Sequence, residues 1–248
     1  MKIKSFLALL VYFSLISCKS NSIDKQIKSA GFFEEDVNLS TFTNNDKSIV
    51  YFPIRHVGTK NFYNNIQFKV DSLASKGFVF FIEGINTDST KLSIQRIDTL
   101  ELKLRKIVGG NVNIYIDTIN STYMGYPFKN NKGLINQPKY SKLGISKTNS
   151  EHSDVSLDLL IDEYENKFGT IVLSECDYNT SPNTVYQCIT VPESNKKYIV
   201  LDFRDIKLAK YIADSPHKKI AVIYGSNHEK GLYRELKKID SLWTYLSK

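Results

Sequence analysis

Four ionisable side chains stand at the ends of apolar runs in the sequence, and their types suit the activation of water. Each comes at the carboxyl end of a predicted strand: His56 after Ser48–Ile54, Glu83 after Phe78–Ile82, Arg204 after Tyr198–Phe203 and His228 after Lys219–Tyr224. Parallel strands bring these ends to one edge of a sheet, where open α/β folds bind their ligands. We therefore expect the four side chains to meet in one cleft.

Two histidines and a carboxylate suit an open metal site. A divalent metal such as Zn²⁺, Mn²⁺ or Co²⁺ on His56, Glu83 and His228 would turn its bound water into a nucleophile, and Arg204 would stabilise the oxyanion that forms. Without a metal, His56 or His228 would act as general base, with Glu83 orienting it. Both mechanisms stay open, because the sequence has neither a short-spaced zinc motif nor a Gly-x-Ser-x-Gly elbow.

Each of these residues also has a structural interpretation. Glu83 ends an apolar run, so its carboxylate needs a partner, and a metal, a histidine or Arg204 could supply it. A Glu83–Arg204 pair with a purely structural role is the alternative to a site role. His56 would otherwise only hydrogen-bond a loop, but its place before Gly58-Thr59 favours a role in a site. His228 begins a predicted helix, whose amino end favours a neutral imidazole.

Two further acids are expected at the same edge of the sheet. Glu175 and Asp177 follow the predicted strand Thr170–Leu173 and are candidates for ligand binding. His152 and His217 lie in polar sequence, and we expect both to be solvated.

Strands must alternate with helices for the strand ends to meet. Helical spacing predicts helices over Phe62–Lys76 with Gly77 as the stop, over Leu92–Ile107, from an N-cap at Ser153 to Phe168, over Ile206–Ala213, and in a last helix with Leu232, Leu236, Ile239, Trp243 and Leu246 on one side. A further strand is predicted over Val112–Ile116. The alternation predicts one α/β domain with a mostly parallel sheet flanked by helices.

A long polar insertion interrupts this pattern between Asn120 and Ser150. It is either a lid over the site or a flexible surface excursion. Within it, Tyr123, Tyr126 and Tyr140 are the residues that suggest contact with a substrate.

The first residues have the features of a bacterial lipoprotein signal. Lys2 and Lys4 precede an apolar stretch, Phe6 to Ile16, that is too short to span a bilayer and ends in the lipobox Leu15-Ile16-Ser17-Cys18. We predict a signal peptide over 1–17, a tether over 18–28 beginning with the lipidated Cys18, and one domain over 29–248. Diacylglycerol and palmitate on Cys18 would anchor the chain in the bacterial cell envelope, at the outer membrane or the periplasmic face. A buried helix with an incidental cysteine is the alternative.

Charge and cysteine content are consistent with an exported protein. The formal net charge of +7 is scattered rather than gathered in a stripe, so nucleic acid is not an expected partner. The expected partners are the membrane, through the lipid, and a small-molecule or peptide substrate. Besides Cys18 there are Cys176 and Cys188, which form either a disulfide or two buried free thiols.

These motifs resemble the TraB and Tiki-like superfamily, which includes erythromycin esterases and ChaN-like haem-binding lipoproteins. The resemblance covers most of residues 51–236 and rests on the His56 segment, Phe-Ile-Glu-Gly with Glu83, the Arg204-Asp205 pair and Gly225-x-x-His228. The first motif lacks the glycine that usually precedes the histidine, and Asp205 stands where asparagine is common.

The resemblance implies an α/β domain with two histidines, a glutamate and an arginine in a metalloprotease or another water-activating hydrolase. The competing function is a binding lipoprotein, in which the histidines and the tyrosine-rich insertion hold haem or another small ligand without turnover. A third is an inactive scaffold, at which the altered first motif hints.

Overall fold

The computed structural model describes residues 25, 27–29, 31–87, 90–110, 115–117, 119–127, 133–182 and 184–247 of the 248-residue chain. The predicted signal peptide, Cys18 and most of the tether lie outside these ranges. Within the described ranges, no helix has both the length and the apolar character needed to cross a membrane.

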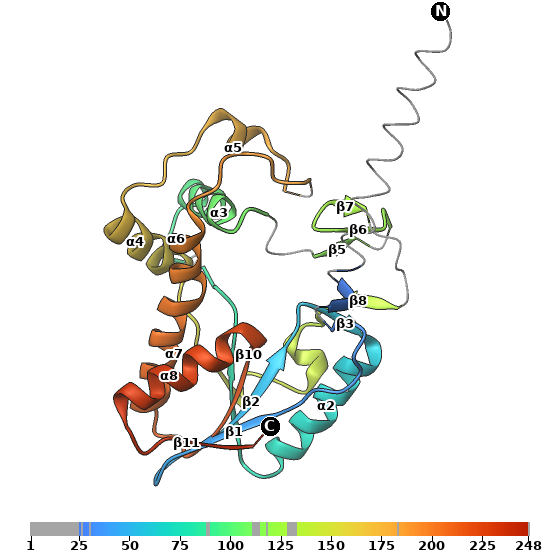
Figure 1. Ribbon diagram of the computed structural model, residues 1–248, viewed down its shortest axis with the longest axis vertical. Helices are drawn as coiled ribbons and strands as arrows, with labels where there is room; N and C mark the ends of the chain where they lie inside the picture. The colour runs from blue at the N-terminus through green and yellow to red at the C-terminus, as the bar shows by residue number, and fades with distance from the viewer. Residues whose placement is uncertain are drawn as a thin grey trace, which may run out of the picture.

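A six-stranded sheet forms the centre of the lower half of Figure 1. Its strands, in spatial order, are β11 (Thr244–Ser247), β1 (Ser40–Thr43), β2 (Ser48–Ile54), β10 (Lys219–Gly225), β4 (Val79–Ile82) and β9 (Ser150–His152). The pairs β2–β10, β10–β4 and β4–β9 are parallel, whereas β11–β1 and β1–β2 are antiparallel. The predicted mostly parallel α/β sheet is therefore confirmed.

Helices cover both faces of this sheet. Along β10, Val222 and Tyr224 pack against α7 (Phe203–Asp214) and α8 (Glu229–Ile239), while Ala221 and Ile223 belong to the core under α2 (Lys60–Ala74). A strand covered on both faces has no polar side, which explains the continuous apolar runs in the sequence.

Most of the remaining elements lie beyond the carboxyl edge of the sheet (Figure 1), whereas the η1 turn packs against α2. Helices α3 (Ile94–Val108) and α4 (Leu157–Phe168) share a separate apolar cluster with Ile199 and Phe203. The shorter elements are α5 (Glu175–Asn179), α6 (Glu193–Lys197), the strand pair β3 (Val57–Thr59) and β8 (Leu134–Asn136), the small sheet β5 (Ile116–Asp117), β6 (Thr122–Tyr123) and β7 (Tyr126–Pro127), and the 3₁₀ turns η1 (Tyr140–Leu143) and η3 (Ser226–His228).

The polar insertion carries secondary structure of its own. In its described part, β6, β7, β8 and η1 follow one another, and the segment ends in the main sheet as β9. Of the strand predicted over Val112–Ile116, residues 112–114 lie outside the described ranges, and Ile116 begins β5.

The predicted strand Tyr198–Phe203 is wrong. The residues Tyr198–Asp202 form a π-helical turn, η2, which joins α6 and α7 into one continuous helical segment. Ile199 and Phe203 are buried four positions apart, as on one face of a helix. A short apolar run is compatible with a buried strand and a buried helix alike, so its pattern does not separate the two.

Three other predicted elements need correction. Residues 170–173 form no strand, since only Ile171 of the run is buried and its N–H donates to Glu165 Oε1 at 2.8 Å. The last helix ends at Ile239, so Trp243 is buried in the following turn and Leu246 lies in β11. The N-cap of α4 is Ser156 rather than Ser153.

Candidate functional site

Three adjacent strands of the sheet position three of the predicted site residues. β10 pairs with β2 up to Gly225 and Ile54, and with β4 up to Ile223 and Ile82. Glu83 follows β4, His56 follows β2, and His228 ends the η3 turn after β10. The sheet therefore brings these residues to its carboxyl edge, as predicted.

Arg204 reaches the same edge from a helix and not from a strand. Only residues 215–218 separate the end of α7 from the start of β10, so α7 runs back along the sheet and its first turn lies at the carboxyl edge. The prediction placed Arg204 correctly in space for the wrong structural reason.

The guanidinium of Arg204 is the centre of a buried group of charges. Nε donates to Asp154 Oδ1 (2.9 Å), and Nη2 donates to Asp154 Oδ2 (2.5 Å) and Glu83 Oε1 (2.8 Å). Nη1 donates to Val200 O (3.1 Å), in the π-helical turn, and to His228 Nε2 (3.1 Å). All five N–H donors of the guanidinium are therefore used.

These contacts fix the tautomer of His228. Arginine can only donate, so Nε2 of His228 accepts and carries no proton in this arrangement. Nδ1 donates to Asp205 Oδ1 at 2.7 Å. Gly231 of α8 leaves room for this carboxylate, because a Cβ there would lie 1.7 Å from Asp205 Oδ2. His228 is thus a neutral imidazole whose ring is oriented by Asp205.

Glu83 has the most open position in this group. Its Oε2 accepts the Gly225 N–H at 2.6 Å, and its Oε1 lies 3.6 Å from His228 Nε2. The side chain of Glu83 is 10% exposed, against 5% for Arg204 and 1% for Asp154. Since a carboxylate has about four lone-pair positions, Glu83 can accept a further hydrogen bond.

We call Glu83, Asp154, Arg204, Asp205 and His228 the Arg204 cluster. Burial acts to raise the pKa of Glu83 and of Asp154, but the charge and hydrogen bonds of Arg204 outweigh it, so both pKa values are lowered. Burial also acts against the charge of Arg204, yet the two carboxylates raise its pKa. For Asp205, burial outweighs the hydrogen bond from His228 and raises the pKa. Glu83 and Asp154 are therefore ionised at neutral pH.

Three aromatic side chains, His56, Tyr115 and Tyr140, lie near Glu83. The exposed ring of His56 stacks on Tyr115 with ring centroids 4.6 Å apart, and its charge contributes to lowering the pKa of Glu83. Burial, with Glu83 contributing, raises the pKa of Tyr115 to about 12. Tyr140 of the polar insertion donates to Glu83 O at 2.9 Å. Among the described residues, no hydrogen bond or ion pair joins the His56 ring to the Arg204 cluster, so His56 lies beside it.

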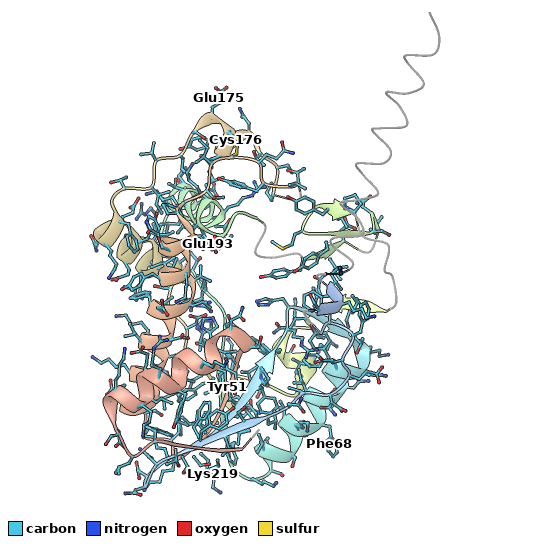
Figure 2. All side chains as sticks on the ribbon, viewed as in Figure 1. Tyr51, Phe68, Glu175, Cys176, Glu193 and Lys219 are labelled. Carbon is cyan, nitrogen blue, oxygen red and sulfur yellow. A yellow bond between two sulfur atoms is a disulfide. The ribbon has the colours of Figure 1, made fainter. Side chains whose placement is uncertain are left out.

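Glu175 and Asp177 do not join this site. Figure 2 shows Glu175 at the top of the view and Tyr51, whose hydroxyl donates to Gly225 O beside the cluster, in its lower half. Asp177 is buried in α5, where it accepts from Lys106 Nζ (2.8 Å) and Ser174 Oγ (2.8 Å).

The two other histidines lie outside the Arg204 cluster. His152 is exposed, as predicted, whereas Nε2 of His217 is paired with Glu151 Oε1 at 2.8 Å. The expectation that His217 is merely solvated is therefore wrong.

Two members of the Arg204 cluster were missed as site residues. Asp154 follows β9, a three-residue polar strand that has no apolar run to reveal it. Asp205 enters the sequence comparison only as a departure from a motif. Two features of the sequence could have identified it as a site residue: it follows Arg204 directly, and a small residue, Gly231, stands three positions after His228.

The metal ligands predicted from the sequence do not fit this arrangement. Nε2 of His228 is taken by the Arg204 guanidinium, whose positive charge would also repel a metal, and His56 is stacked on Tyr115. In the part of the chain that the structure describes, no three His, Cys, Asp or Glu side chains gather as a metal-binding group. Arg204 instead supplies the positive charge beside Glu83 and Asp154.

Cys176 and Cys188 are joined by a disulfide, with an S–S distance of 2.00 Å. Of the two alternatives that the sequence left open, the structure has the disulfide. It closes the loop that begins in α5 and leads towards α6.

Comparisons of the chain with protein-family models, with curated proteins and with solved structures find no match.

Proposed function

We propose that this chain is a hydrolase in which Glu83 binds the attacking water and His228 takes its proton. The observation that carries the proposal is the Asp205–His228 hydrogen bond beside an ionised Glu83. It gives an imidazole of fixed orientation, with an unprotonated Nε2, 3.6 Å from a carboxylate oxygen that can accept from water. Oriented bases of this kind contribute roughly 10²- to 10⁴-fold to rate.

The reaction needs one local rearrangement. Arg204 Nη1 moves away from His228 Nε2, which then accepts a proton from the water held by Glu83. The resulting hydroxide attacks the substrate carbonyl carbon, and the leaving group departs with the proton from Nε2. Asp205 stabilises the imidazolium in between, as the aspartate does in a Ser-His-Asp triad.

The role proposed here for Arg204 differs from the oxyanion stabilisation that the sequence suggested. All five of its donors are in use in the structure, and only Nη1 gives up an acceptor, when it moves away from His228 Nε2. In the proposed site it is a positioning residue that holds Glu83 and Asp154. His56 and Tyr115, stacked beside Glu83, are proposed to contact the substrate.

The disulfide supports an extracytoplasmic location, because such bonds persist in oxidising compartments. We propose that the chain is a lipoprotein anchored through Cys18 in the cell envelope. Incorporation of labelled palmitate tests this, with loss of label expected for Cys18→Ala. The relation to the TraB and Tiki-like superfamily remains a proposal resting on the order of the four motifs.

The hydrolase proposal is tested with purified protein against panels of chromogenic esters and fluorogenic peptides. We expect turnover that falls about 100-fold or more in Glu83→Gln and in His228→Gln. His217→Ala is the matched control, because this histidine pairs with Glu151 outside the cluster, and it should retain activity. Thermal unfolding of each variant checks that it is folded.

Two results would contradict this proposal in different ways. Activity that is lost with a chelator and restored by Zn²⁺, Mn²⁺ or Co²⁺ would favour the metal mechanism. No hydrolysis, together with a haem absorbance band after reconstitution that disappears in His56→Ala, would favour the binding lipoprotein.

A further inference from the structure

A cavity of about 510 Å³ borders the Arg204 cluster at Asp154. One wall comes from α7 and the residues after it, and the other from the segment that runs from β9 into α4. Asp154 lines the cavity, whereas the other four members of the cluster do not. Its volume is in the range of sites that bind small molecules.

Part of the cavity lining is apolar. Leu159 of α4 and Tyr211 of α7 line it and are 41% and 39% exposed, and Val155, which follows Asp154 in the chain, lines it too. Partly exposed apolar side chains around a cavity of this size favour a ligand with an apolar body.

Two of the three acids that line the cavity, Glu151 and Asp154, are already paired. Glu151 accepts from His217 Nε2 (2.8 Å) and from the Tyr211 hydroxyl (2.9 Å). Asp154 is held by two N–H groups of Arg204. Neither carboxylate therefore needs a cation from a ligand.

In the part of the chain that the structure describes, the two lysines at the wall are not paired with a carboxylate, although Lys207 Nζ lies 5.2 Å from the centre of the Phe203 ring. Lys207 and Lys210 are exposed, and among the described residues neither has a carboxylate within salt-bridge distance. Asp214 also lines the cavity, one helical turn after Lys210 (roughly 6 Å along the axis) and two turns after Lys207 (roughly 10 Å), so Lys207 is the lysine farther from this carboxylate. The end of the cavity at Lys207 is therefore positively charged.

We propose that this cavity binds a small amphipathic anion. The apolar body lies against Leu159 and Tyr211, and a carboxylate is held by Lys207 and Lys210. This site is separate from the proposed water-activating groups and does not depend on them.

The test uses two fluorescent probes with the same ring system. One is 1-anilinonaphthalene-8-sulfonate, an anion, and the other is N-phenyl-1-naphthylamine, its uncharged counterpart. In the double variant Lys207→Gln/Lys210→Gln, the affinity for the anion should fall about tenfold or more, while the neutral probe binds as before. Leu159→Asn should weaken both probes.

Lys230→Gln is the control, because Lys230 is an exposed lysine of α8 outside the cavity. Equal affinity of the anionic probe for wild type and the double variant would overturn the proposal. So would an equal loss of both probes in the double variant, provided that thermal unfolding shows it to be folded.

Competition then identifies the source of the carboxylate. Displacement of the anionic probe by octanoate alone assigns a lipid-derived acid, and displacement by N-acetyl-leucyl-leucine alone assigns a peptide carboxyl terminus. Failure of both to displace the probe would overturn the assignment of a carboxylate.

Discussion

Two regions of this molecule bury an aspartate against a cation, and they are built in different ways. In the Asp177 cluster, which comprises Lys106, Ser174, Asp177 and Tyr186, three of the four residues lie in one short stretch that contains the disulfide. In the Arg204 cluster, the five residues come from four separate parts of the chain.

The difference between the clusters lies in what remains available for chemistry. Asp177 accepts hydrogen bonds from Lys106, from Ser174 and from the Tyr186 hydroxyl, and its side chain is 2% exposed. The Arg204 cluster adds an oriented imidazole and a carboxylate that can accept from water. Buried charge and a lowered pKa are common to both, so those properties alone do not identify a reactive site.

The largest difference is expected when the central cation is removed. Arg204→Leu leaves Glu83 and Asp154 without their main partner and should lower the free energy of unfolding by about 3–5 kcal/mol. Lys106→Leu leaves Asp177 with Ser174 and Tyr186 and should cost about 1–3 kcal/mol. Urea unfolding measures both, and equal losses would show that the two clusters are alike in energy.

Removing the disulfide should affect only the Asp177 cluster. The bond spans 12 positions, and opening a loop of this size costs about 3 kcal/mol. In Cys176→Ser/Cys188→Ser we expect faster amide hydrogen exchange around α5, while exchange in β10 and η3 is unchanged. Loss of protection at η3 would mean that the two regions unfold together.

Acid should remove the contributions of Glu83, Asp154 and Asp177 to stability, and the sign follows from their lowered pKa values. A carboxyl with a folded pKa below its unfolded value stabilises the fold above the unfolded pKa, and this contribution is lost as pH falls through the folded pKa. Unfolding free energy should therefore decline below about pH 4. Glu83→Gln should flatten this decline; an unchanged slope would contradict the lowered pKa of Glu83.

The smallest expected effect concerns Tyr115. Its pKa of about 12 reflects burial first and the Glu83 charge second. In Glu83→Gln the pKa should fall slightly and stay above its ordinary value of 10.0, whereas Asp177→Asn should leave it unchanged. Titration followed by NMR of ¹³C-labelled tyrosine rings measures this, and equal responses to the two variants would contradict the proximity of Glu83.

The sheet edge was predictable because β2, β4 and β10 are covered on both faces, which makes their apolar runs unmistakable in the sequence. That reasoning placed Glu83 and His228 correctly. It failed for β9, whose residues Ser150–His152 are polar, and so Asp154 was missed.

The helix that carries Arg204 could not be predicted from the sequence, for a different reason. The run before it is apolar because it packs against α3 and α4, a contact between distant segments that no local pattern contains. The disulfide was one of two alternatives that the sequence left open. The pairing of Lys106 with Asp177 could not be predicted, because it depends on how α5 packs on α3.

Because every N–H donor of Arg204 already has an acceptor, a new partner can bind the guanidinium only by displacing one of these acceptors. Any molecule that hydrogen-bonds to the guanidinium must replace an acceptor that is already present, so its gain is the difference between two hydrogen bonds rather than the energy of one. A neutral carbonyl replacing a carboxylate would lose energy, because the buried guanidinium would lose the attraction of an opposite charge. Replacing the Val200 carbonyl or the His228 ring costs less. Nη1 is therefore the part of Arg204 through which the cluster exchanges partners.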